Sequence, residues 1–154
     1  MTFKETIDAL GKELGVKMEI EDDTCAVSLD AKEGDHVTIL LQGQDERGMM
    51  LTCADLGEPP PEGREALYQS LLEANDLYGG TAGATLSLDS RTGRVRIQRI
   101  DALDALADVG LSRAFIAFAD TAAAWKRFVA DVRAAAKDTS GAEMPSAIDG
   151  LLRV

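Results

Sequence analysis

The sequence has little of the chemistry that most enzymes and metalloproteins use. It contains one histidine and two cysteines among 154 residues. Cys25 and Cys53 form no Cys-x-x-Cys motif, and His36 alone cannot complete a four-ligand zinc site with them. Both cysteines lie in apolar, strand-like runs, which favours buried thiols, although the sequence also leaves a disulfide between them open. We therefore expect neither a metal site nor a cofactor.

Long apolar runs and excess basic charge are also missing. No stretch of about 18 apolar residues occurs, and the opening residues Met-Thr-Phe-Lys-Glu lack the basic and apolar regions of a secretory signal. The formal net charge is −11, which repels nucleic-acid phosphates and anionic membrane surfaces. The sequence thus predicts a cytoplasmic protein that binds neither nucleic acid nor membrane.

Much of the acidic charge lies early, where residues 19–23 read Glu-Ile-Glu-Asp-Asp. The spacing differs from a calcium-binding loop, which needs oxygen ligands at alternate positions and a central glycine. Two interpretations remain open. The cluster is either a solvated face that keeps the protein soluble, or an acidic surface that steers a basic partner.

Hydrophobic patterning predicts one α+β domain. Thr2 and Glu5 form a capping box before apolar residues at helical spacing, which predicts a helix over 3–14. Alternating apolar residues then predict four short strands, at 16–20, 25–29, 36–42 and 49–56. Further along, the pattern predicts a helix, two strands, a turn or short helix and a last helix, at 62–76, 84–88, 95–100, 101–109 and 111–137.

The last helix carries the most regular apolar stripe: Leu111, Phe115, Phe118, Ala122, Trp125, Val129, Val132 and Ala136. Residues 1–137 are predicted to form an antiparallel sheet flanked by helices, and residues 138–154 a flexible tail. Three helices with apolar faces exceed what two faces of one sheet can cover. We therefore expect some apolar surface to remain for another chain.

The candidate catalytic motifs in this sequence lack the secondary-structure order or the partner residues that catalysis requires. The glycine-rich residues 79–83 follow a predicted helix and precede a predicted strand, the reverse of a phosphate-binding loop. His36 begins a strand and has no evident nucleophile to activate. A small enzyme or ligand carrier would need a polar pocket with convergent titratable groups. The sequence predicts a binding protein and not an enzyme.

Residues 71–89 carry a family resemblance. They read as a helix ending in Leu-Leu-Glu-Ala-Asn, a glycine-rich loop, and Thr-Leu-Ser-Leu-Asp. This segment resembles the type III secretion chaperones of the CesT (Tir chaperone) family, the class I effector chaperones. The opening helix, the Leu56-Gly57 step followed by prolines, and Trp125 on a long last helix also fit. The resemblance covers residues 3–135.

The resemblance implies an α-β-β-β-α-β-β-α fold and a homodimer that holds the extended N-terminal region of a secreted effector, without ATP. The implied dimer interface comprises Tyr68, Leu71, Leu72, Asn75 and Leu86. The implied partner-binding patches comprise Ile7, Leu10, Leu14, Val27, Leu29, Ile39 and Leu41. The alternative is a general protein-interaction or regulatory module of the same fold, unrelated to secretion.

Overall fold

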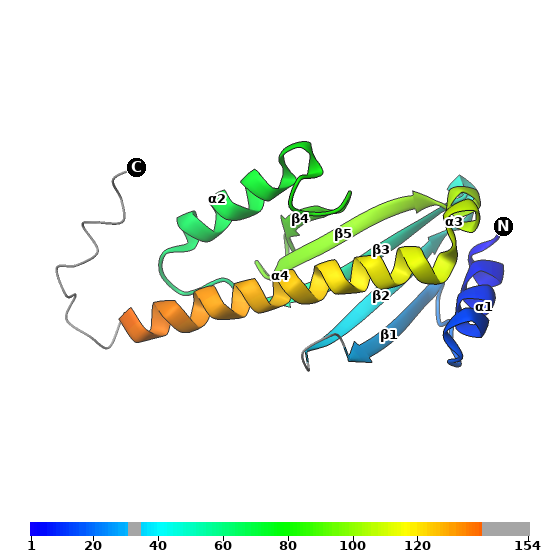
Figure 1. Cartoon of the computed structure of the whole chain (residues 1–154), viewed down its shortest axis with the longest axis horizontal. Coiled ribbons are helices and arrows are strands. Elements are labelled where there is room, and N and C mark those ends of the chain that lie inside the picture. The colour runs from blue at the N-terminus through cyan, green and yellow to red at the C-terminus, as the bar shows by residue number, and fades with distance from the viewer. Residues whose placement is uncertain (31–34, 140–154) are drawn as a thin grey trace.

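The computed structural model describes residues 1–30 and 35–139 (Figure 1). Its elements are α1 (Phe3–Leu14), β1 (Thr24–Asp30), β2 (His36–Gln44), η2 (Asp45–Arg47), β3 (Met49–Gly57), α2 (Arg64–Asn75), η3 (Asp76–Tyr78), β4 (Thr85–Leu88), β5 (Val95–Ala102), α3 (Leu103–Val109) and α4 (Leu111–Thr139). This order confirms the predicted α+β fold. The predicted tail at 138–154 starts inside α4, and its residues 140–154 lie outside the described residues.

The five strands form one sheet in the order β1-β2-β3-β5-β4, and every neighbouring pair is antiparallel. The first three strands make the predicted meander. β5 pairs with β3, so β4 and β1 are the two outer strands. In β2, Val37, Ile39 and Leu41 are buried while Thr38 and Leu40 between them are exposed. One face of the sheet is therefore covered and the other is open.

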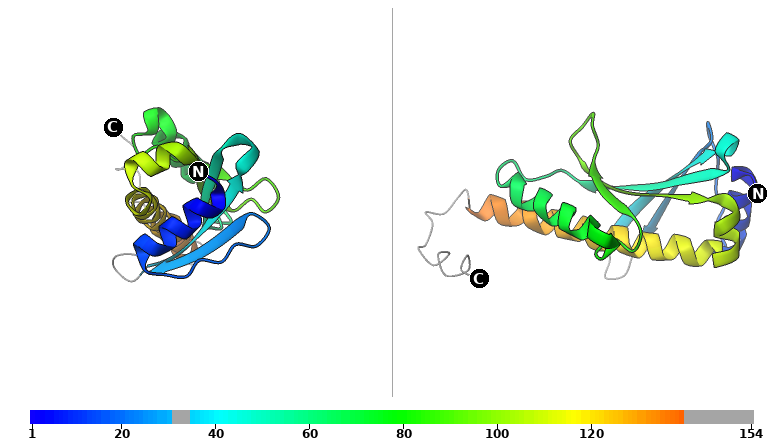
Figure 2. Two further views of the ribbon diagram at one scale, coloured as in Figure 1. Left: turned by 90° about the vertical axis from the view of Figure 1, so that its right-hand side faces the viewer. Right: turned by 90° about the horizontal axis from the view of Figure 1, so that it is seen from above.

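The helices cover that buried face. α4 packs across β3 and β2, and α1 packs against α4 and β2 (Figure 2). The largest fully buried side chains are Phe3, Phe118, Ile7, Leu10, Ile39, Leu41, Leu56, Leu67, Ile97, Leu103, Val37 and Val95. Within residues 1–30 and 35–139, no helix combines the length and apolar character that crossing a bilayer requires.

Local sequence signals set the ends of α1. The Thr2 hydroxyl accepts the Glu5 N–H at 3.2 Å, and the Glu5 carboxylate accepts the Thr2 N–H at 2.8 Å. Gly15 ends the helix with φ 69°, a left-handed conformation that glycine adopts without steric strain. The apolar stripe of α4 also packs as predicted, with its first four members buried.

Two segments differ from the prediction. Residues 16–20 form no strand, and only Glu21 pairs with Thr24 as an isolated bridge. This segment returns the chain from α1 to β1, and Met18 and Ile20 pack partly against the core. Their alternation therefore reflects side-chain packing and not strand pairing. α2 begins at Arg64, two residues late, because Gly63 has a left-handed φ of 72°.

Candidate partner-binding surfaces

Titratable groups do not assemble a catalytic site in the part of the chain that the structure describes. No three His, Cys, Asp or Glu side chains there are placed to hold a metal ion. Cys25 and Cys53 are buried free thiols, and burial raises the pKa of each. His36 is exposed, with Nδ1 3.1 Å from an Asp30 carboxylate oxygen. None of these groups pairs a nucleophile with a base.

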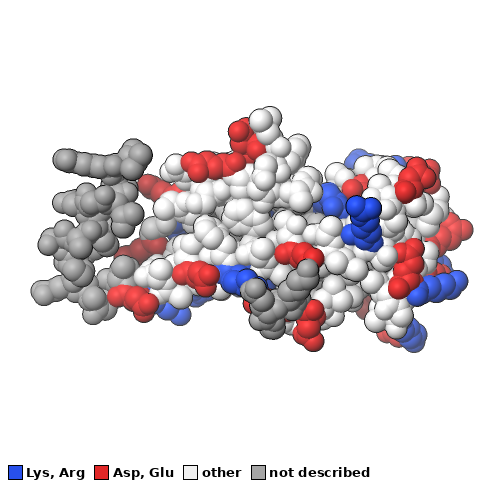
Figure 3. All heavy atoms as spheres, in the orientation of Figure 1, with Lys and Arg blue, Asp and Glu red and all other residues white. Residues whose placement is uncertain are grey.

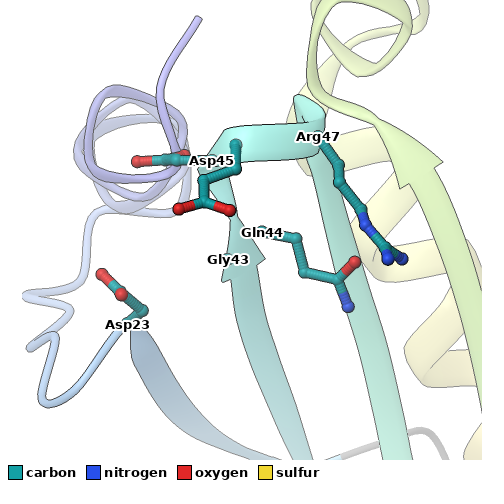
Figure 4. A pocket seen from close by; sticks show the side chains of 6 residues that line it. Asp23, Gly43, Gln44, Asp45 and Arg47 are labelled. Atoms are coloured by element: carbon teal, nitrogen blue, oxygen red, sulfur yellow. The ribbon is translucent and has the colours of Figure 1, made fainter.

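A surface hollow lies at the end of β2, beside the start of α1 (Figure 4). It is lined by Asp23, Gly43, Gln44, Asp45, Glu46 and Arg47. The Asp45 carboxylate accepts the Phe3 N–H at 2.7 Å and so joins η2 to the first turn of α1. In Figure 4, Asp23 and Asp45 lie on one side of β2, while Gln44 and Arg47 point to the other. The labelled polar side chains thus lie on two sides of β2, and one of them, Asp45, already joins η2 to α1.

Most of the expected partner-binding residues are core residues. Ile7, Leu10, Ile39 and Leu41 are each at most 2% exposed and present no side-chain surface to a partner. This corrects the expectation for those four, because the apolar faces of α1 and β2 pack against α4. Leu14, Val27 and Leu29 are half-buried at the margin of the core and remain accessible.

The accessible margin follows the outer edge of β1, which we call the β1 edge (Thr24–Asp30). The Gly43 N–H donates to the Asp23 carbonyl at 2.8 Å, which fixes the hydrogen-bonding phase of β1 against β2. In an antiparallel pair, the backbone groups of alternate residues point away from the partner strand. Here those are Thr24, whose groups bond Glu21, and then Ala26, Ser28 and Asp30. The latter three face outward.

The β1 edge combines apolar and acidic side chains. On the helix-covered side, Leu14, Met18, Ile20, Val27 and Leu29 are partly buried against the core. Sequence reasoning missed Met18 and Ile20 as site residues, although their apolar alternation was visible.

The acidic residues gather beside that edge, around a second surface hollow. Its lining includes Glu19, Glu21 and Asp22 together with Thr24 and Ala26 of β1. A hydrogen bond from Lys17 at 2.8 Å lowers the pKa of Glu19. Glu19 is therefore charged at neutral pH, and the acidic lining of this hollow favours a partner with basic side chains.

The expected dimer residues divide into core and surface positions. Leu71 and Leu86 are 4% exposed and belong to the core, and Tyr68 is half-buried. Leu72 is 70% exposed. The Asn75 amide contacts the backbone of Leu86 within the protomer, so its polar atoms are occupied. Of the five, Leu72 offers the largest free apolar surface.

Two further apolar side chains, which the sequence did not single out, adjoin the end of α2. Leu77 is 90% and Tyr78 57% exposed, and both have φ near +50°, a region that such residues rarely adopt. Trp125 of α4 donates to the Gly80 carbonyl at 2.9 Å and holds the following loop. We call Leu72, Leu77 and Tyr78 the α2 corner. Figure 3 shows an uncharged area over part of α2 and the middle of α4.

Solved structures share this fold at low sequence identity. A chain of the HopA1–SchA chaperone–effector complex is 18% identical with a TM-score of 0.58, covering 82% of this chain and 91% of that chain. For the structure of the Yersinia pestis type III secretion chaperone SycH in complex with a stable fragment of YscM2, the identity is 16% and the TM-score 0.59, covering 79% of this chain and 97% of that chain. For the ExoU–SpcU complex from the Pseudomonas aeruginosa type III secretion system, the identity is 19% and the TM-score 0.54, covering 82% of this chain and 96% of that chain.

The sequence itself identifies the family. No curated protein sequence matches the chain. The sequence profile of the Tir chaperone protein (CesT) family, however, matches residues 5–126. That match spans well over half of the chain and agrees with the resemblance that residues 71–89 carry. The protein therefore belongs to the Tir chaperone protein (CesT) family.

Proposed function

We propose that this protein is a non-catalytic, cytoplasmic, homodimeric chaperone of type III secretion. It binds an extended segment near the N-terminus of a secreted effector and keeps that effector competent for secretion. Membership of the CesT family supports this proposal, as do structural neighbours that include a chaperone–effector complex and a heterodimeric complex from a type III secretion system. Those neighbours are under 20% identical, so they support the class of partner and not its identity.

The observation that carries the proposal is the β1 edge. It offers outward backbone groups on Ala26, Ser28 and Asp30, as a strand does that lacks a neighbour on one side. Val27 and Leu29 on the same strand are half-buried. An extended partner can therefore pair its backbone with β1 and place alternate side chains against Val27 and Leu29.

The energetics suit a partner without a fold of its own. Each backbone hydrogen bond contributes about 1 kcal/mol net, and each apolar side chain that becomes buried adds about 1.5–3 kcal/mol. A segment that is disordered when free must offset its ordering entropy over many such contacts. The carboxylates near Glu19 and Asp22 raise the rate of encounter with a basic segment, and salt screens this effect.

A proline at position 28 tests strand addition directly. The Ser28 N–H points outward, so Ser28→Pro removes a donor from the β1 edge without removing a bond to β2. We expect the affinity for the N-terminal segment of the effector that co-purifies with this protein to fall about tenfold or more, because 1.4 kcal/mol corresponds to tenfold. Isothermal titration calorimetry measures this affinity.

Ser28→Ala is the matched control. Ser28 Oγ lies 2.9 Å from the Thr38 hydroxyl, and the alanine variant loses this bond but keeps the outward N–H. It should bind within about twofold of the wild type, since exposed substitutions have small effects. Equal affinities of the proline and alanine variants would exclude pairing at the β1 edge.

A further inference from the structure

The sheet has a second outer strand, β4, whose free backbone groups can be located from its pairing. The Asp89 N–H donates to the Arg94 carbonyl at 2.8 Å, in register with the β4–β5 pairs. Alternation then directs the backbone groups of Ser87 toward β5 and those of Leu86 and Leu88 away from it. Because β4 has only four residues, Leu86 and Leu88 provide its entire outward edge.

One side chain occupies the outward groups of Leu86. Asn75 Nδ2 donates to the Leu86 carbonyl at 2.9 Å, and the Leu86 N–H donates to Asn75 Oδ1 at 2.8 Å. The amide thus bonds both groups, as a residue of a neighbouring strand would. Only Leu88 remains outward, and a single residue is too short to receive a strand.

The position of Asn75 is held from several sides. It is the last residue of α2, and the Gly80 N–H donates to the carbonyl of the preceding Ala74 at 3.1 Å. A Cβ at Gly80 would lie 2.9 Å from the Ala74 Cβ, so the turn packs tightly against the helix end. Trp125 bonds the Gly80 carbonyl from α4. Packing around the end of α2 therefore fixes the position of the Asn75 side-chain amide.

We propose that Asn75 is a positioning residue that closes the β4 edge and leaves β1 as the strand-accepting edge of the described sheet. This inference rests on the proposed function, in which the partner adds a strand. Each protomer then receives one extended segment at one defined place. Closure of β4 also prevents a second copy of the chain from pairing there.

The test compares Asn75→Ala with Gln69→Ala in the full chain without any partner. The Gln69 amide donates to Glu73 on the exposed surface of the same helix, so its loss removes a comparable amide away from β4. In Asn75→Ala we expect hydrogen exchange at the Leu86 amide to rise at least about tenfold, because its acceptor is gone. Light scattering should show an average mass that rises with concentration above that of the wild type. Gln69→Ala should change neither quantity.

A second substitution separates edge closure from a general structural role. The Leu88 N–H points outward, so Leu88→Pro blocks strand pairing at β4 without removing a bond to β5. Adding Leu88→Pro to Asn75→Ala should restore the wild-type mass, whereas a structural defect would persist. Asn75→Asp keeps an acceptor for the Leu86 N–H but no donor for its carbonyl. It should give intermediate association and carries the test if the alanine variant does not fold.

Unchanged Leu86 exchange in Asn75→Ala would overturn the inference, as would extra mass that Leu88→Pro does not suppress. Neither result bears on effector binding at the β1 edge. The proposed function fails separately, if Ser28→Pro and Ser28→Ala bind the effector segment equally well.

Discussion

Replacing both Leu72 and Leu77 with aspartate should convert the proposed dimer into a folded monomer. These side chains are 70% and 90% exposed in the protomer, the largest values among the large apolar residues that the structure describes. Burying one leucine contributes about 1.5–3 kcal/mol, and a two-fold interface buries each leucine twice. Four charged replacements should therefore weaken the dimer by at least about 10³-fold. Sedimentation at micromolar concentration, with circular dichroism as a check of folding, measures this change.

Val109→Asp provides the matched control, since Val109 is 60% exposed at the end of α3, away from the α2 corner. This variant should keep the wild-type mass, which we expect near twice 16.4 kDa. A double aspartate variant that sediments with the wild type would show that the α2 corner is not the interface. So would a wild type that is monomeric at micromolar concentration.

The backbone of the α2 corner supports an interface there. Leu77 and Tyr78 have φ values of 50° and 55°, and each left-handed non-glycine residue costs about 1–2 kcal/mol. A turn with this strain persists because packing around it determines the conformation. Its result is to hold two large apolar side chains outward. Such strain concentrates where a surface serves binding.

Adding a methyl group at Gly43 should destabilise the fold by about 3 kcal/mol, at the upper end of typical overpacking effects. A Cβ there would lie 2.5 Å from Phe3 Cγ and 2.7 Å from Phe3 Cβ and Cδ1. Phe3 is 1% exposed, and its N–H is held by Asp45, so the ring cannot move aside. Thermal unfolding of Gly43→Ala should show a midpoint lowered by roughly 6–12 °C for a domain of this size.

Gly79→Ala is the control for this substitution. Its added Cβ would have an ordinary contact of 3.5 Å with the Asp76 carbonyl, and its φ of −62° suits alanine. We expect its stability to stay within about 0.5 kcal/mol of the wild type. In the Phe3→Ala background, Gly43→Ala should destabilise less than it does alone, because the two sites are in contact. Full additivity would refute the proposed clash.

Local signals in the sequence predicted the elements of the fold well. The Thr2–Glu5 capping box and Gly15 set the ends of α1, and the stripe from Leu111 onward set α4. These features depend on residues a few positions apart. The strand prediction for residues 16–20 was wrong, because alternating apolar residues indicate only that a segment has one buried and one exposed face. They do not show whether another strand pairs with it.

The site was harder to predict, because an apolar face does not reveal what covers it. Ile7 and Ile39 were expected to contact a partner, but α4 covers them, and that packing joins residues far apart in sequence. The exposure of Leu77 depends on a left-handed backbone conformation that no local sequence pattern predicts. The role of Asn75 depends on its distance to Leu86, eleven residues later.

The unequal edges of the sheet limit how copies of this protein can associate. If both outer edges of the sheet were open, β1 of one copy could pair with β4 of the next copy. Such head-to-tail pairing could continue without limit. Because Asn75 bonds both outward backbone groups of Leu86, β4 is closed to such pairing and β1 remains as the open edge of the described sheet. Closure of β4 therefore blocks head-to-tail growth, in which β1 of each copy would pair with β4 of the next.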